Sequence, residues 1–229
     1  MNQKKTNSFD DIVGHSNRLL IVTTPGWNSV DGSMQRYERQ SGKWTKIGSA
    51  VPVVVGKSGL GWDPVLLGEQ KQSSDGPVKH EGDGRSPAGI FEVGNVFGFA
   101  DSGPTGRKYV SLTSAVECVD DTKSNHYAHI VDRNDVPKVN WDSSEKMREI
   151  EVYKLGMVVN YNLASTVPGN GSCIFLHIWR GPGRGTAGCT AMDEARLEEL
   201  VKWIGDEKAA LVQVPSAEYE REKKEWGLP

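Results

Sequence analysis

The chain has 229 residues, of which 27 are lysine or arginine and 30 are aspartate or glutamate, so its formal net charge at pH 7 is -3. This balance argues against a strongly basic nucleic-acid-binding protein, and a content of 37% hydrophobic and 25% charged residues argues against disorder throughout. No run of 18 apolar residues is present, so the sequence predicts no transmembrane segment.

The first half of the chain is expected to be rich in strands and turns. The polar residues 1–16 predict a flexible N-terminal segment, and residues 17–229 are long enough for a single domain with its own core. Apolar or alternating runs predict strands, two of them flanking Gln-Ser-Gly as in a β-hairpin, at 17–23, 33–39, 43–47 and 51–55. The many glycine, serine, aspartate and proline residues of 56–89 predict a long loop.

The second half contains further strands and one clear helix. Strands are predicted at 90–99, 108–112, 151–160, 172–179 and 209–214, and a helical turn with a serine N-cap at 141–149. A helical face is marked by apolar residues three and four apart, namely Leu197, Leu200, Val201 and Ile204. Thr190 and Asp193 have the spacing of a capping box, Gly205 suits the end of that helix, and a charged tail helix should end at Gly227. Because strands dominate without βαβ alternation, the sequence predicts a mostly β fold, an antiparallel sandwich or barrel with a few helices.

Cys189 and His177 are the residues of this sequence most suited to nucleophilic catalysis. Cys189 lies between a glycine-rich loop and the predicted helix, where free N–H groups and the helix dipole would favour a thiolate. The 11 residues between the two side chains could form a loop that brings the imidazole to the thiol proton. The N–H groups of Gly188 and Cys189 could form an oxyanion hole. The alternative is a buried core cysteine and a structural histidine.

The other cysteines and histidines leave alternatives open. Cys118 and Cys173 could form a disulfide if the protein is exported, or could be two buried thiols. His126 and His129 are three residues apart, but no third ligand has suitable spacing, so we expect no metal site. No motif predicts a cofactor.

Two segments resemble the active-site motifs of the L,D-transpeptidase (YkuD-type) family. In Phe175–Met192, a histidine and a loop precede Thr186-Ala187-Gly188-Cys189, similar to the family's His, loop and Ser/Thr-His-Gly-Cys. Asp83–Phe91 resembles the family's Gly-x-x-x-Pro-x-Gly stretch before a strand. The two segments lie about 100 residues apart, in the order of the family, and between them cover the core of its catalytic domain.

The resemblance implies a β-sandwich of mixed and antiparallel sheets with a few helices, and a mechanism. Cys189 would be the nucleophile and His177 the base, and the carbonyl of Ile178 would orient the imidazole. The thiolate would attack the carbonyl between an L-centre and a terminal D-residue of a peptidoglycan stem peptide. D-alanine would be released and a thioester acyl-enzyme would remain. The amine of a second stem, or water, would then resolve this thioester.

The sequence departs from the family motif in three ways, one of which is a loop shorter than is usual in the family. The motif's second histidine, before Gly-Cys, is Ala187 here, and Thr190-Ala191-Met192 lacks the Arg or Asn that often follows the cysteine in the family. Arg180 or Arg184 could hold the substrate carboxylate instead, because a guanidinium binds a carboxylate bidentately; each could equally be a solvated loop charge. We also expect Thr186 and Trp179 at the substrate groove.

The resulting expectation is an L,D-transpeptidase whose partners are donor and acceptor stem peptides of peptidoglycan. The alternatives are an L,D-carboxypeptidase or amidase that uses water, and an inactive wall-binding module. Such an enzyme would be periplasmic or associated with the cell wall, but residues 1–14 contain no apolar signal region. We therefore expect the export signal to have been removed or trimmed upstream. The sequence does not predict the oligomeric state.

Overall fold

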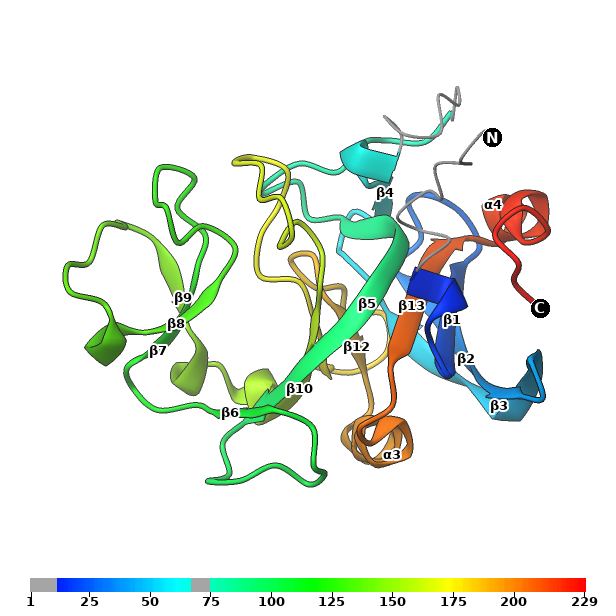
Figure 1. Cartoon of the computed structure of the whole chain (residues 1–229). Coiled ribbons are helices and arrows are strands. Elements are labelled where there is room, and N and C mark those ends of the chain that lie inside the picture. Colours follow the sequence, from blue (N-terminus) through cyan, green and yellow to red (C-terminus); the bar gives the residue numbers. More distant parts are fainter. Residues whose placement is uncertain (1–11, 67–74) are drawn as a thin grey trace, which may run out of the picture.

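The computed structural model describes residues 12–66 and 75–229 (Figure 1). Of the predicted N-terminal segment, residues 1–11 lie outside the described residues. Residues 12–14 are helical, and Val13 is buried in the main core. Arg39 Nη2 donates to the Val13 carbonyl at 2.8 Å, so this short stretch is bound to the second strand of the sheet. A single domain over residues 17–229 stays a prediction.

The main sheet closes on itself. Its hydrogen-bonded order is β10-β11-β12-β3-β2-β1-β13-β5-β4, and β10 also pairs with β5, so the path from β10 to β5 forms a ring. The members of this ring are β1 (Arg18–Thr24), β2 (Asp31–Gln40), β3 (Lys43–Val54), β5 (Ser86–Gly98), β10 (Leu155–Val159), β11 (Phe175–Ile178), β12 (Thr190–Met192) and β13 (Ala209–Pro215). Parallel and antiparallel pairs alternate irregularly around it, which confirms the predicted mostly β fold with mixed sheets.

Two short strands join the ring at β5. β4 (Leu60–Trp62) and β6 (Tyr109–Ser111) each pair with β5 in parallel. β4 lies inside the segment 56–89, where the sequence predicts only a long loop. Its three residues are fully buried, and this burial explains why a segment rich in glycine still contains a strand.

A second sheet of three strands stands beside the ring, at the left of Figure 1. Its order is β8 (Ile130–Asp132), β7 (Val116–Val119) and β9 (Ser144–Lys146), followed by the 3-10 turns η2 (Met147–Glu149) and η3 (Glu151–Tyr153). The helical turn predicted at 141–149 is therefore present only as the 3-10 turn η2 and is wrong over residues 141–146. There, β9 pairs with β7, and both Ser144 and Lys146 donate to the buried carboxylate of Glu117 on β7.

The helices lie at the ends of the chain's last strands. α3 (Glu194–Ile204) buries the predicted apolar face against β10 and β11 and ends at Gly205, whose φ of 54° favours glycine. Its N-cap is Asp193, which accepts from the Ala195 N–H at 3.0 Å, so the capping box predicted from Thr190 is wrong. α4 (Ser216–Glu222) ends before the predicted Gly227. No helix of the described residues is both long and apolar enough to cross a membrane.

The buried side chains form two clusters. The larger fills the ring and the face beneath α3. The smaller lies where the ring meets the three-stranded sheet, and its members are Phe97, Leu112, Val116, Cys118, Met147, Tyr153, Cys173, Phe175 and Cys189. The candidate nucleophile therefore lies at the junction of the two sheets, buried in the smaller cluster.

Candidate active site

The register of two strands brings His177 and Cys189 to one face. β11 and β12 pair in parallel, with His177 opposite Ala191. Side chains alternate between the faces of a strand, so Cys189, two residues before Ala191, lies on the same face as His177. The loop between them runs from β11 back to the start of β12, as the spacing predicts.

The His177 ring is held in one tautomer. Its Nδ1 lies 2.7 Å from the carbonyl oxygen of Ile178, which can only accept a hydrogen bond, so Nδ1 carries the proton and Nε2 is unprotonated. Burial lowers the pKa of His177 to about 4, with the hydrogen bond to Ile178 opposing the shift and the charge of Arg180 adding to it. The imidazole is thus neutral near pH 7 and can accept a proton at Nε2.

The Cys189 thiol is buried and neutral. Its Sγ accepts a hydrogen bond from the Phe175 N–H and donates to the Cys173 carbonyl, each at 3.3 Å. Burial raises the pKa of this thiol well above its usual range, and the charge of Glu145 adds to that shift. The N–H of Phe175 acts in the opposite direction, as would a hydrogen bond donated by the Tyr153 hydroxyl.

The predicted placement of Cys189 at a helix N-terminus is wrong. The residues after it form the buried strand β12, and α3 begins only at Glu194. β12 has partners on both sides, β11 and β3, and this pairing explains why the chain continues as a strand. The α3 dipole therefore falls outside the distance of one helical turn over which it would stabilise a thiolate.

Hydroxyl groups fix the backbone around Cys189. Thr186 Oγ1 donates to the Cys189 carbonyl at 2.5 Å and accepts from the Gly188 N–H at 3.1 Å. Ser86 Oγ donates to the same carbonyl at 2.9 Å. Ser86 belongs to the upstream motif segment Asp83–Phe91, so the two motifs found in the sequence meet at this oxygen.

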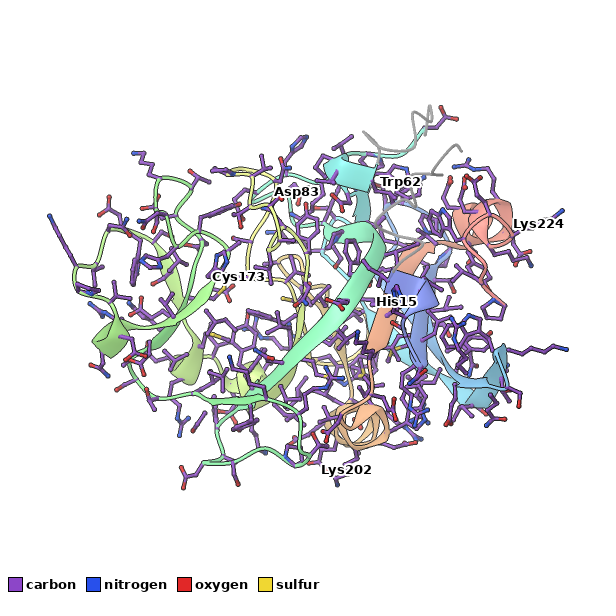
Figure 2. All side chains as sticks on the ribbon, in the orientation of Figure 1. His15, Trp62, Asp83, Cys173, Lys202 and Lys224 are labelled. Atoms are coloured by element: carbon purple, nitrogen blue, oxygen red, sulfur yellow. A yellow bond between two sulfur atoms is a disulfide. The ribbon has the colours of Figure 1, made fainter. Side chains whose placement is uncertain are left out.

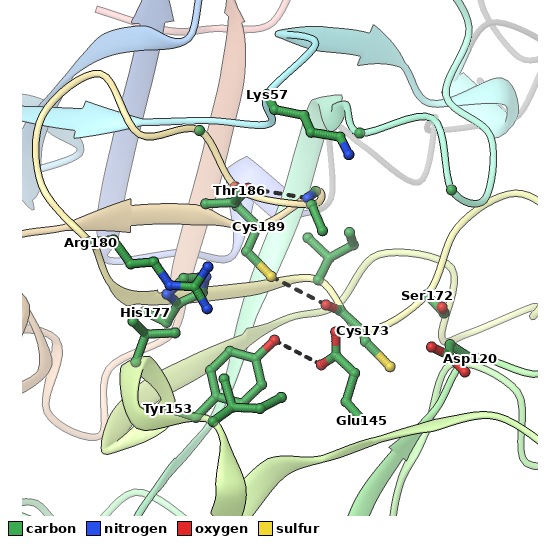
Figure 3. A pocket seen from close by; sticks show the side chains of 18 of the residues that line it. Lys57, Asp120, Glu145, Tyr153, Ser172, Cys173, His177, Arg180, Thr186 and Cys189 are labelled. Carbon is green, nitrogen blue, oxygen red and sulfur yellow. Dashed lines mark hydrogen bonds between the residues drawn. The ribbon is translucent and has the colours of Figure 1, made fainter.

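A cavity of about 420 Å³ opens over the thiol (Figure 3). Most of the site residues predicted from the sequence line it: His177, Trp179, Arg180, Arg184, Thr186, Gly188 and Cys189. Arg180 and Arg184 are exposed, and so is Lys57, a third exposed cation at the cavity that no motif marks in the sequence. A fourth cation of the lining, Lys79, is buried. Ile178 contributes through its carbonyl, behind the imidazole.

The opposite part of the cavity is acidic. It is lined by Glu81, Asp120 and Glu145, and Figure 3 shows Asp120 and Glu145 away from Lys57 and Arg180. Asp120 follows β7 and Glu145 lies on β9, so the three-stranded sheet provides two of the carboxylates of this acidic wall, while Glu81 comes from the segment before β5.

Tyr153 stands between the acidic wall and the thiol. Its Oη donates to Glu145 Oε2 at 2.7 Å, and its ring packs edge-on against the His177 ring at a centroid distance of 5.3 Å. Figure 3 shows the Cys189 sulfur on the other side of this hydroxyl from Glu145, and both side chains line the cavity. Neither Tyr153 nor any residue of the acidic wall was among the site residues expected from the sequence, because all of them lie outside the two motif segments.

A disulfide connects the two sheets at the site. Cys118 on β7 bonds to Cys173, two residues before the start of β11, with a Cα–Cα distance of 5.9 Å. Figure 2 labels Cys173 between the two sheets. The third cysteine, Cys189, is free.

His126 and His129 lie away from the cavity. His126 packs edge-on against Trp141, and His129 Nδ1 lies 2.8 Å from the Tyr127 carbonyl. Within residues 12–66 and 75–229, no three histidine, cysteine or acidic side chains are grouped so that they could hold a metal ion.

Comparison with known proteins identifies one family. The model of the L,D-transpeptidase catalytic domain (YkuD) matches residues 30–214 of the chain. This range contains both motif segments, every residue named above as lining the cavity, and the disulfide. The search of curated proteins gave no match.

Solved structures of two proteins are similar to the chain. One is the helical cell shape determining protein Pgp2 from Campylobacter jejuni, with 16% identity and a TM-score of 0.39 over 91% of this chain and 54% of that one. The other is Bdellovibrio bacteriovorus Bd1075, with 14% identity and a TM-score of 0.42 over 94% of this chain and 56% of that one. The chain thus spans about half the length of these structures.

Proposed function

Because the chain belongs to the L,D-transpeptidase catalytic domain family, we propose that it is a cysteine-dependent L,D-transpeptidase acting on peptidoglycan stem peptides. The observation that carries the proposal is the set of His177, the Ile178 carbonyl and Cys189 at the cavity. The carbonyl holds the imidazole so that its unprotonated Nε2 is available, and the thiol lies on the same face of the sheet.

The first half-reaction forms a thioester. His177 Nε2 takes the thiol proton while Sγ attacks the carbonyl between the L-centre and the terminal D-residue. The same proton then passes to the nitrogen of the leaving D-amino acid, and the C–N bond breaks. Because both side chains are neutral in the free site, this proton transfer accompanies the attack on substrate and does not precede it.

The second half-reaction releases the acyl group. The neutral amine of a second stem attacks the thioester, His177 Nε2 takes one of its protons, and this proton returns to the sulfur as the C–S bond breaks. A crosslink results, or an exchanged terminal residue when the amine belongs to a free D-amino acid. With water as acceptor, the same steps make the protein an L,D-carboxypeptidase or amidase.

The tetrahedral oxyanion needs hydrogen-bond donors beside Cys189. The N–H groups of Gly188 and Cys189 are the proposed donors. In the free site the Gly188 N–H is bonded to Thr186 Oγ1, so binding of the substrate would replace that bond with one to the oxyanion. Thr186 Oγ1 would keep its bond to the Cys189 carbonyl and so hold the peptide in place.

The exposed cations at the edge of the cavity, Lys57, Arg180 and Arg184, form a cationic rim, which is the proposed site for the stem carboxylate. Arg180 and Arg184 have guanidinium groups that suit a carboxylate, and Trp179 offers an apolar wall beside them. This arrangement would replace the Arg or Asn that the family motif has after the cysteine. A protein with this substrate would work in the periplasm or at the cell wall.

The decisive experiment is mass spectrometry after incubation with tetrapeptide-stem muropeptides. We expect an acyl adduct on Cys189 and a product that is either a crosslink or a trimmed stem, which separates an amine acceptor from water. Cys189→Ala should give neither adduct nor turnover. His177→Gln should lose turnover, while His126→Gln, a histidine outside the cavity, should keep it. An active Cys189→Ala variant would refute the proposal, and a folded wild type without any adduct would support the wall-binding alternative.

A further inference from the structure

Two polar groups surround the thiol on the side opposite the glycine-rich loop. The Tyr153 hydroxyl donates to the Glu145 carboxylate at 2.7 Å, and the Cys189 sulfur lines the same cavity beside it. Figure 3 shows the hydroxyl aimed at Glu145, with the sulfur on its other side. A phenol has one proton to donate, so it can serve only one of these two neighbours at a time.

The direction of this one proton depends on Glu145. When Glu145 is ionised, Tyr153 donates to the carboxylate, and only an oxygen lone pair is left to face the sulfur. A lone pair facing the sulfur repels the negative charge of a thiolate and so favours the neutral thiol, whose proton goes to the Cys173 carbonyl. When Glu145 is protonated, its O–H can donate to the Tyr153 oxygen, and the phenol proton becomes available to the sulfur. A donor facing the sulfur favours the thiolate.

We infer that Tyr153 is a catalytic residue that stabilises the Cys189 thiolate by hydrogen bonding, and that Glu145 is a positioning residue whose protonation turns the Tyr153 proton toward the sulfur. No proton leaves the pair in this step; the same hydroxyl only changes its partner. The inference deepens the proposed function and rests on Cys189 being the nucleophile.

Three features of the structure favour this assignment. The Tyr153 side chain is buried and held by aromatic contacts with His177, Phe97 and Phe175, so the hydroxyl has little freedom to leave its place. Glu145 lies on β9 opposite Cys118 of β7. The disulfide from Cys118 to Cys173 connects this part of the small sheet to the segment before β11. Burial, with the charges of Asp120 and Glu81, raises the pKa of Glu145 to about 7, although the hydrogen bond from Tyr153 opposes the shift.

The charged and titratable groups around the pair come from every neighbouring element. Asp120 follows β7 and Glu81 precedes β5, and both face Glu145. Lys79 and His177 face Cys189, and Arg180 faces His177. Lys57 and Arg184 stand at the cavity rim. On β9, the neighbouring Lys146 is engaged by Glu117, so its charge is balanced there.

The test measures the thiol itself and needs no peptide substrate. Cys189 is the one cysteine outside the disulfide, so unreduced protein offers iodoacetamide a single thiol, and the rate of alkylation follows the fraction of thiolate. The rate is measured by mass spectrometry from ~pH 5 to ~pH 9. A protein that fails to turn over muropeptides can still pass this test, so the two proposals can fail separately.

Loss of the carboxylate should make the thiol more reactive. In Glu145→Gln and Glu145→Leu, the phenol proton no longer serves a carboxylate, and we expect alkylation near pH 8 to be roughly five- to tenfold faster. In Tyr153→Phe we expect alkylation to be roughly fivefold slower below pH 7, where Glu145 is protonated in the wild type. Tyr161→Phe, which removes another buried hydroxyl with an edge-on aromatic neighbour, should change neither rate.

The shape of the pH profile and a double-mutant cycle distinguish this from a structural role. The logarithm of the wild-type rate should rise by less than one unit per pH unit around pH 7, because Glu145 loses its proton there, and Glu145→Gln should restore a slope of one. In the Tyr153→Phe background, Glu145→Gln should accelerate alkylation much less. Equal acceleration in both backgrounds would show that Glu145 acts only as a nearby charge, and this would overturn the inference. Slower alkylation in both Glu145 variants, with native circular dichroism, would overturn it as well.

Discussion

The Cys189 thiol donates to the carbonyl of Cys173 at 3.3 Å, and Cys173 is the residue that the disulfide joins to Cys118. Cys173 has a φ of 54°, a left-handed conformation that residues other than glycine rarely adopt. The disulfide therefore holds in place the group that accepts the proton of the candidate nucleophile. It also ties that group to the sheet that contributes Glu145.

Removal of this disulfide should weaken both the fold and the site. For the Cys118→Ala/Cys173→Ala double variant, we expect a loss of about 2–4 kcal/mol in the free energy of unfolding, because the unfolded chain is no longer crosslinked. Urea denaturation measures the loss. A reductant should lower the melting temperature of the wild type and leave the double variant unchanged. Denatured, unreduced wild type should contain one free thiol; three would contradict the disulfide.

The Thr186 hydroxyl should matter for catalysis more than the size of its side chain. Thr186→Val removes the hydrogen bonds to the Cys189 carbonyl and from the Gly188 N–H. The partly buried Gly188 N–H then has lost this acceptor, and the Cys189 carbonyl has lost one of its donors. We expect kcat with muropeptides to fall by roughly tenfold and the stability by about 1–2 kcal/mol. Thr186→Ser keeps the hydroxyl and should stay within about threefold of the wild type. If valine and serine give the same rate, the hydroxyl has no such role.

The cationic rim should control substrate affinity. If Arg180 or Arg184 holds the stem carboxylate, its replacement by alanine should raise KM roughly tenfold with little change in kcat, because the contact is equally present in the ground and transition states. Lys57→Ala reports whether the third cation shares the task. Steady-state kinetics on one donor stem decides, and unchanged KM in both arginine variants would remove this role from them.

The buried carboxylate of Glu117 should stabilise the three-stranded sheet. Burial opposes its charge, but hydrogen bonds from Lys146, Ser144 and Trp141 outweigh that effect and lower the pKa of Glu117 to about 2. The pKa in the folded state is thus below the unfolded value. The contribution to stability is present above about pH 4.5 and is lost as the pH falls toward 2.

Glu117→Gln should accordingly lower the free energy of unfolding by about 1–3 kcal/mol at pH 7 and by less at pH 3. Urea unfolding at the two pH values gives the difference. Glu149→Gln, an exposed position after the same sheet, serves as the control and should change little. A loss of equal size at both pH values would show that the charge of Glu117 is not responsible.

Glu145 should have the opposite effect on stability. Its pKa is raised to about 7 in the folded state, so the folded protein binds its proton more tightly than the unfolded chain does. That contribution is complete below about pH 4.5 and is lost as the pH rises through 7. Glu145→Gln should therefore raise the melting temperature at pH 8 relative to the wild type, and much less at pH 4. A lower melting temperature at pH 8 would contradict the raised pKa.

Local sequence patterns were sufficient for those elements whose neighbours are close in the chain. The hairpin of β2 and β3 follows from its turn, and α3 follows from one apolar face and a terminal glycine. The start of α3 does not follow from the sequence pattern, because Thr190 has the right spacing for a cap but lies in a buried strand. The same strand pairing removed the helix terminus expected behind Cys189.

The sequence by itself determined the mostly β fold, the family, and the candidate pair His177 and Cys189, because alternating patterns and short motifs are local. Only the tertiary structure decided which groups surround the thiol. Tyr153 and Glu145 come from segments about 40 residues before Cys189, Glu145 from the separate small sheet and Tyr153 from the turn η3 that follows it. Their closeness depends on strand register, on a disulfide between residues 55 positions apart, and on burial at the junction of two sheets. Burial also reversed the expected direction of the cysteine's pKa, because solvent exclusion acts through the whole fold and not through neighbours in the chain.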